Sequence, residues 1–210
     1  MVKQVRAERT RQALIAAAAV EFDRRGYAGT SLSAVHRACG MTMGALSFHF
    51  PTKAELARAV LQEAEDITRG ALARFAPARP VPPVAEFTLA LATLLDEEAS
   101  VRATARLTHE QAVPSLWPTL WRTALQDLMA PARERPGTGP GPAPGELELL
   151  AVYLTAGAEA ALRAGRTGEE VRAQLACLWS LALGPSPDPA PEALAPSTDE
   201  CPVDAAPTPH

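Results

Sequence analysis

The chain has few of the residues on which metal sites, disulfide frameworks and most enzyme active sites depend. Among 210 residues there are only four histidines and three cysteines, Cys39, Cys177 and Cys201. The cysteines are odd in number and lack metal-ligand spacing, which argues against a zinc site or a disulfide scaffold. No Gly-rich phosphate loop and no nucleophile elbow occurs in the sequence. We therefore expect a protein that is not an enzyme and needs no cofactor or metal.

Aromatic residues and long apolar runs are also scarce. Aromatic residues make up 5% of the chain, although 47% of it is hydrophobic and alanine is abundant. No apolar run is long enough to span a bilayer, and the basic start leads into a charged helix rather than a signal peptide. This composition predicts an all-α, cytoplasmic protein without a membrane partner.

Apolar residues recur at helical spacing through most of the chain, and strand signals are few. We expect helices near residues 6–25, 31–39, 42–49, 53–74, 84–98, 100–112, 115–134, 146–164 and 168–183. Residues 135–145 are rich in Pro and Gly and predict a loop. From 184 to 210 the chain alternates Pro, Ala, Ser and acids, which predicts a disordered tail.

The most informative stretch is residues 30–53, which predicts two short helices joined by a tight turn. Thr30 and Ser31 are candidate caps for the first helix, and Gly40 has the backbone freedom to end it. Thr42 can cap the second helix. A helix, a turn and a second helix of this size form the unit that places a recognition helix in the DNA major groove.

The next helix also begins with a clear signal. Pro51 ends the second short helix, because the residue before a proline leaves the helical region. Thr52 and Glu55 then have the spacing of a capping box at the start of a long helix. This long helix, 53–74, runs out of the three-helix unit, and we expect it to transmit conformational changes to the rest of the chain.

Charge is divided unequally along the chain. Residues 1–60 hold nine basic and four acidic residues, a balance of +5, whereas the whole chain carries −4 and residues 61–210 therefore carry −9. A basic end on an acidic protein is typical of a DNA-binding head on a body with another role. The alternative is that these charged residues only form a solvated face. Their coincidence with the helix-turn-helix signals makes this alternative the weaker one.

The N-terminal sequence resembles the TetR family of bacterial transcriptional regulators. The resemblance rests on Ala18, Phe22, Gly26, Tyr27, Thr30, Ser31, the run from Gly40 to Phe50, Lys53 and Leu56. It implies a helix-turn-helix DNA-binding domain over 1–52 and a helical ligand-binding and dimerisation domain over 53–183. The opening Arg-Ala-Glu-Arg-Thr-Arg and the Phe-Asp-Arg-Arg-Gly-Tyr run resemble the actinomycete γ-butyrolactone receptors, which control antibiotic production. Ser47 departs from the tyrosine of most family members.

The expected DNA-binding residues lie on and around the helix at 42–49. Leu46 and Phe50 should face inward. Outward positions expected near the groove are Thr42, Met43, Gly44, Ala45 and Ser47, expected phosphate anchors are Ser31, Ser33, His49 and Lys53, and Lys3 and Arg6 are expected to form an arm. Because no Arg, Asn or Gln lies on this helix, sequence specificity should depend partly on apolar contacts and DNA shape. For His49 the alternative is a structural hydrogen bond within the unit.

The expected effector site involves Trp117 and Trp121, which lie among leucines at 115–130. The resemblance implies that Trp121 lines the pocket of a small hydrophobic effector such as a γ-butyrolactone. Thr88 and Thr104 are candidate polar contacts, together with His109 and Gln111. The alternative is that the tryptophans are ordinary core.

A homodimer is expected from the helices at 146–164 and 168–183, which are apolar over more than one face. Its expected interface residues are Leu150, Leu154, Ala158, Leu175 and Leu178. The alternative is that these are core helices of a monomer.

These features together predict a repressor that binds double-stranded, inverted-repeat operator DNA and is released by its effector. The alternatives of the same fold are a receptor-like regulator that senses an antibiotic or a biosynthetic intermediate, and an activator. An enzyme and a purely structural helical protein are the alternatives from other classes.

Overall fold

A computed structural model describes residues 2–75, 83–134 and 141–184. In these ranges the chain forms nine helices and no strand, which confirms the all-α prediction. The helices are α1 (Val2–Gly29), α2 (Leu32–Ala38), α3 (Met43–His49), α4 (Lys53–Arg74), α5 (Pro83–Glu97), α6 (Ala99–His109), α7 (Trp117–Glu134), α8 (Pro144–Arg163) and α9 (Gly168–Leu183). Two predicted segments lie largely outside the described residues. These are positions 185–210 of the predicted tail and positions 135–140 of the predicted loop.

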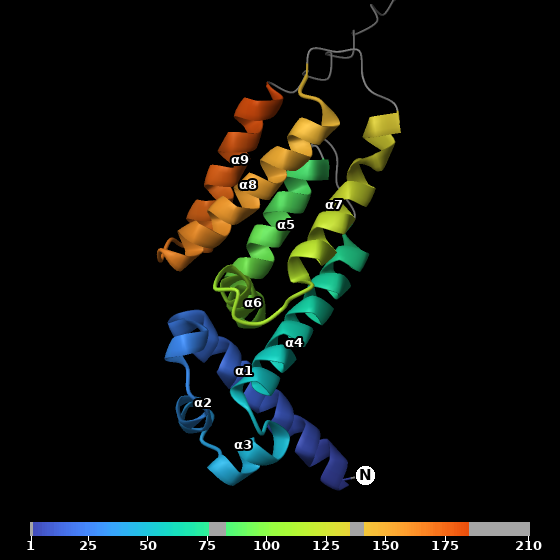
Figure 1. The fold of residues 1–210 in the computed structure, drawn as a ribbon. Coiled ribbons are helices and arrows are strands. Elements are labelled where there is room, and N and C mark those ends of the chain that lie inside the picture. Colours follow the sequence, from blue (N-terminus) through green and yellow to red (C-terminus); the bar gives the residue numbers. More distant parts are fainter. Residues whose placement is uncertain (1, 76–82, 135–140, 185–210) are drawn as a thin grey trace, which may run out of the picture.

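The first three helices and the start of α4 form a head at one end of the molecule (Figure 1). Its core contains fully buried Phe22, Leu46 and Leu56, one each from α1, α3 and α4. Phe50 is also buried, so the two residues expected to hold α3 in place do face inward. Tyr27 stacks on Phe22, with ring centroids 6.1 Å apart.

The helix starts of the head are fixed by the predicted caps. The Ser31 hydroxyl accepts a hydrogen bond from the Ala34 amide (3.1 Å), and Thr42 does the same for α3. In the capping box, the Glu55 amide donates to the Thr52 hydroxyl (3.2 Å) and the Thr52 amide donates to the Glu55 carboxylate (3.1 Å). Each bond satisfies a backbone N–H that has no partner within the helix.

Thr30 has a different role from the cap that was expected. Its buried hydroxyl donates to the carbonyls of Glu21 (3.0 Å) and Gly26 (2.8 Å). Gly26 has φ +69°, a conformation that interrupts the regular path of α1. Thr30 therefore ties the chain after this kink back onto α1.

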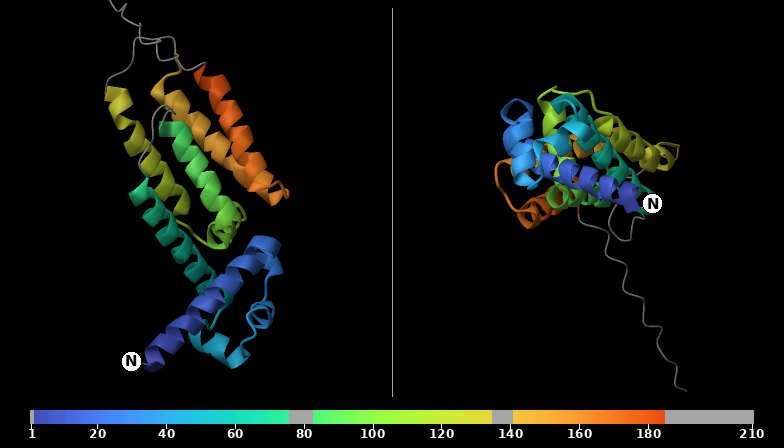
Figure 2. Two further views of the ribbon diagram at one scale, coloured as in Figure 1. Left: turned by 180° about the vertical axis from the view of Figure 1, so that it is seen from behind. Right: turned by 90° about the horizontal axis from the view of Figure 1, so that it is seen from below.

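Helices α5, α7, α8 and α9 form the body, and α4 reaches into it from the head (Figures 1 and 2). The body core contains Phe87, Leu91, Leu125 and all three tryptophans, Trp117, Trp121 and Trp179. No helix of the described chain has the length and apolar content needed to cross a bilayer.

Helix α6 lies between head and body and belongs to both cores. Ala103 and Leu107 are buried with the residues of the head, whereas Val101 and Ala105 are buried with those of the body. Apolar packing is thus continuous across the predicted boundary between residues 52 and 53. Two helices, α4 and α6, connect the parts, where the sequence indicated only the helix at 53–74.

Candidate DNA-binding surface and effector cavity

Helix α3 presents an open surface at the end of the head. Thr42, Met43, Gly44 and Ser47 are exposed, while Ala45 is half-buried. A Cβ atom at Gly44 would have only the Thr42 hydroxyl near it, at 4.0 Å. The helix backbone is therefore free to approach another molecule closely at Gly44.

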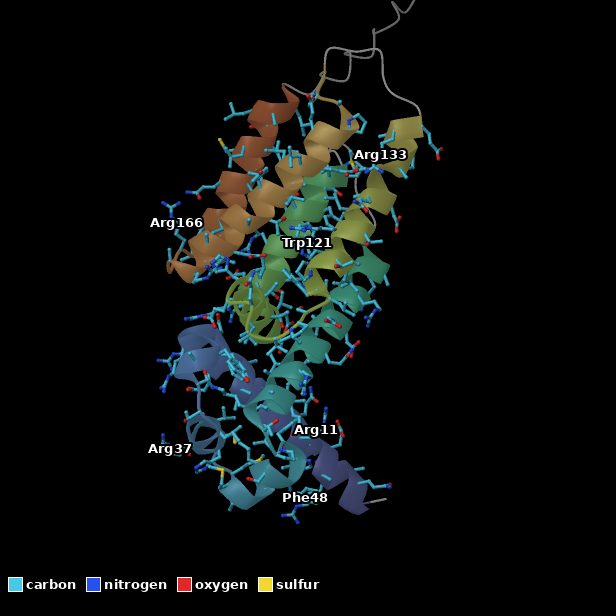
Figure 3. The ribbon with its side chains drawn as sticks, in the orientation of Figure 1. Arg11, Arg37, Phe48, Trp121, Arg133 and Arg166 are labelled. Carbon is cyan, nitrogen blue, oxygen red and sulfur yellow. The ribbon has the colours of Figure 1, made fainter. Side chains whose placement is uncertain are left out.

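Phe48 is a candidate contact that the sequence reasoning missed. It is 81% exposed and points away from the head at the tip of the molecule (Figure 3). Its position between inward-facing Leu46 and Phe50 was the available signal, because residues two apart lie on different helix faces. An exposed phenyl ring beside Met43, itself 37% exposed, adds apolar contact area to α3.

Polar groups lie next to Phe48 on α3 and on the preceding helix α2. His49 is half-buried and its ring meets Phe48 edge-on at 5.2 Å between centroids. No residue in the described ranges forms a hydrogen bond with the His49 ring, so its nitrogens are available to a phosphate. Ser33 and Arg37 are exposed on α2, and the exposed Ser31 hydroxyl is engaged as a cap.

Arg6 is placed differently from the expected arm. It lies within α1, which begins at Val2, and its carbonyl accepts a hydrogen bond from the Thr10 hydroxyl at 3.0 Å. Its exposed side chain is therefore carried by a rigid helix, so that any DNA contact from Arg6 depends on the direction of α1.

Lys53 lies inside the head rather than on its open surface. Its half-buried ammonium group donates to the carbonyl oxygens of Tyr27 (2.8 Å) and Thr30 (3.0 Å). It also lies 4.3 Å from the centre of the Tyr27 ring. The two hydrogen bonds use two of the three donors of the ammonium group. The geometry therefore favours a structural role for Lys53 over the phosphate contact that the sequence predicted.

A polar network joins α6 to the end of α1. Arg102 forms an ion pair with Asp23 (2.8 Å), and Arg106 donates to the Asp23 carbonyl (2.7 Å). Glu110 accepts from Arg106 (2.9 Å) and from the Tyr27 amide (2.8 Å). Burial alone would raise the pKa of Glu110, but the Tyr27 amide and Arg106 outweigh it and hold the pKa below 4.5. The carboxylate form is thus the one that links body to head.

The predicted effector residues Trp117 and Trp121 line one cavity of about 160 Å³ between α6, α7 and α8. The centroids of their rings lie 6.2 Å apart. The Trp117 indole N–H donates to Thr68 on α4 (2.9 Å), whereas the buried Trp121 N–H has no partner among the described residues. Of the two tryptophans that line the cavity, Trp121, in the interior of the body (Figure 3), is therefore the one whose indole N–H has no partner in the described chain.

The polar residues of this cavity are not the two threonines that were expected. Thr88 and Thr104 are buried but do not line it, and the Thr88 hydroxyl donates to the Val84 carbonyl (2.8 Å). The cavity is lined instead by Thr108, His109, Arg122 and Glu159, of which only His109 was named from the sequence. Thr104 and Thr108 lie one turn apart on the same side of α6, so the prediction for Thr104 was wrong by one turn along the helix.

Helices α8 and α9 leave apolar side chains exposed. The exposed fractions are 67% for Tyr153, 46% for Leu178 and 74% for Leu181. Two of the expected interface residues, Ala158 and Leu175, are instead buried with Val171 and Ala92 in the protein's own core. They face inward because α8 and α9 pack on α5, so a partner molecule cannot contact them.

Comparison with known proteins identifies the family. Residues 14–60 match the family described as bacterial regulatory proteins, tetR family. The structure of a γ-butyrolactone receptor, an ArpA-like protein, is 30% identical, and the match covers 85% of this chain and 97% of that one with a TM-score of 0.59. The chain belongs to the TetR family.

Two further proteins resemble this TetR-family regulator. CprB from Streptomyces coelicolor, solved in complex with its operator sequence, is 29% identical over 86% of this chain and 90% of its own, with a TM-score of 0.67. The A-factor receptor protein of Streptomyces griseus is 41% identical over 63 residues, 30% of this chain. That match spans 23% of the receptor's length. These relatives are regulators and not enzymes, as the sequence predicted for this chain.

Proposed function

We propose that this protein is a repressor that binds operator DNA through α3 and releases it when a small, largely apolar effector enters the cavity beside Trp121. The observation that carries the DNA-binding part is the open surface of α3. Gly44 allows close approach there, and Met43 and Phe48 expose apolar area. Thymine methyl groups are the apolar features of the major groove, so this surface is suited to recognising them.

The body supports the proposed release step. The cavity beside Trp121 is lined by Thr108 and His109 of α6, whose neighbour Glu110 is bonded to the Tyr27 amide of the head. A ligand that favours another position of α6 therefore also acts on α1. Such a ligand shifts the head only by its difference in affinity for the two conformations.

Pairing of two heads is proposed through the exposed face of α8 and α9. Tyr153 lies one turn after Leu149, and Leu181 lies nearly one turn after Leu178, so each pair shares a helix face. Apolar faces of this kind mark interaction sites on soluble proteins. A twofold dimer would hold two α3 helices for successive major grooves, spaced by roughly 34 Å.

The alternatives named from the sequence concern the effector and the sign of regulation. An antibiotic or a biosynthetic intermediate would enter the same cavity as a γ-butyrolactone, and an activator would use the same DNA-binding surface. Resemblance to the γ-butyrolactone receptors supports a role in controlling antibiotic biosynthesis genes. A reporter gene behind the protein's own promoter distinguishes repression from activation, because its expression rises or falls when the regulator is deleted.

The test of DNA binding is fluorescence anisotropy with DNA from upstream of the protein's own coding sequence. Gly44→Glu places a carboxylate on the open face of α3, where there is room for it, and should abolish binding without unfolding the head. The matched control is Gly145→Glu, the same change in open space on α8. Equal binding by both variants would show that α3 is not the DNA-binding surface.

A further inference from the structure

Glu159 on α8 lies where two cavities of the protein meet. One is the cavity beside Trp121. The other, of about 270 Å³, lies between the head and the body and is lined by Asp23 and Arg24 of α1 together with residues of α5, α6 and α8. Glu159 and Ala105 line both. A carboxyl group thus lies at the junction of the proposed effector site and the contact between head and body.

This carboxyl group has no hydrogen-bond donor. Within the described parts of the chain, no N–H or O–H group donates to Glu159 and no cation lies within ion-pair distance, although Arg163 and Arg122 act on it electrostatically. Its burial raises its pKa to about 7, against the opposing effect of these two arginines. A partly desolvated carboxyl group that lines a cavity and has no donor from the described residues is a candidate ligand contact.

The other residues that line the cavity beside Trp121 show which further contacts a ligand can make there. Trp117, Pro118 and Val152 provide apolar surface. Among the described residues, neither the Trp121 indole N–H nor the buried Thr108 hydroxyl has a partner, so the indole N–H can bind an acceptor on the ligand. Glu159 is the acidic residue of this wall.

We infer that the effector carries a hydrogen-bond-donating group, a hydroxyl or an ammonium, at one end of an apolar body, and that Glu159 binds this group. The inference rests on the proposed effector cavity and adds the polar chemistry of the ligand to it. A ligand bound in this way satisfies the one carboxyl group that faces both cavities.

Three small probes of matched size test this inference. They are 1-hexanol, its isomer methyl pentyl ether, which has no donor, and 1-hexylamine, which is cationic. Binding is followed by tryptophan fluorescence and by release of labelled DNA. We expect the alcohol and the amine to bind about tenfold more tightly than the ether, the usual effect of one hydrogen bond to a carboxyl acceptor.

Variants at Glu159 assign the difference to this residue. Glu159→Leu should make the three probes equal, and Glu159→Gln, which retains a carbonyl acceptor, should keep the preference for the alcohol and lose that for the amine. Glu169→Leu is the control, since Glu169 is exposed on α9 and lines neither cavity. If Glu159→Leu does not fold, the Gln variant alone decides.

Equal binding of all three probes by the unmodified protein, with DNA release, would overturn the role of Glu159 and leave the proposed effector site standing. If Glu159→Gln still binds the amine more tightly than the ether, the role of Glu159 is also overturned. If none of the probes binds, the effector cavity itself is refuted, and the inference with it.

Discussion

Replacing Lys53 by methionine separates the structural role that the fold gives this residue from the phosphate contact that the sequence indicated. Methionine retains the apolar stem and removes the ammonium group. The variant therefore loses two hydrogen bonds, to the carbonyl oxygens of Tyr27 and Thr30, and the contact with the Tyr27 ring. These contacts connect the start of α4 to the end of α1, so their loss loosens the head.

The magnitude follows from these contacts. Hydrogen bonds from a charged donor contribute about 1.5–3 kcal/mol each, and a cation–π contact about 0.5–1 kcal/mol. Because Lys53 is half-exposed, water replaces part of this interaction in the variant. We expect a loss of roughly 2–3 kcal/mol in the free energy of unfolding. For a chain of this size that lowers the melting temperature by roughly 5–10 °C.

The assay combines thermal unfolding with DNA binding at several salt concentrations. A structural Lys53 predicts a lower melting temperature and weaker DNA binding with an unchanged salt dependence. A phosphate contact predicts an unchanged melting temperature and a slope of log K against log salt that is smaller by about one. Arg58→Met is the matched control, since Arg58 is exposed on the same helix. An unchanged melting temperature together with the smaller slope would refute the structural assignment.

Three further variants test the other parts of the proposal. Trp121→Ala should keep DNA binding and lose the effector response; loss of both together with a lower melting temperature would show that Trp121 is only core. Leu181→Glu puts a charge on the exposed face of α9 and should yield a folded monomer in sedimentation; a wild-type chain that is monomeric at micromolar concentration would refute the paired-head proposal. The Glu110 carboxyl has a lowered pKa, so its stabilisation is present above pH 4.5 and is lost as the pH falls through the lowered pKa. Glu110→Gln should therefore melt below the wild type at pH 7, with the difference vanishing in acid; a difference that does not depend on pH would exclude the carboxylate as the link to α1.

Local signals in the sequence were enough to assign the helices and to recognise the helix-turn-helix head. Caps are local signals, because a Ser, Thr or Glu side chain satisfies backbone groups only two or three residues away. Ser31, Thr42 and the Thr52–Glu55 pair were therefore assigned correctly before any packing was known. The inward direction of Leu46 and Phe50 followed from helical spacing in the same way.

Contacts between residues far apart in the chain depend on how the helices pack and could not be assigned from the sequence. Lys53 bonds to carbonyls 26 and 23 residues earlier, and Glu110 to an amide 83 residues earlier. Sequence periodicity shows that a helix has an apolar face but not which neighbour covers it. For that reason Ala158 and Leu175 were expected at an interface and are buried, while Glu159, an ordinary glutamate in the sequence, lies at the meeting point of two cavities.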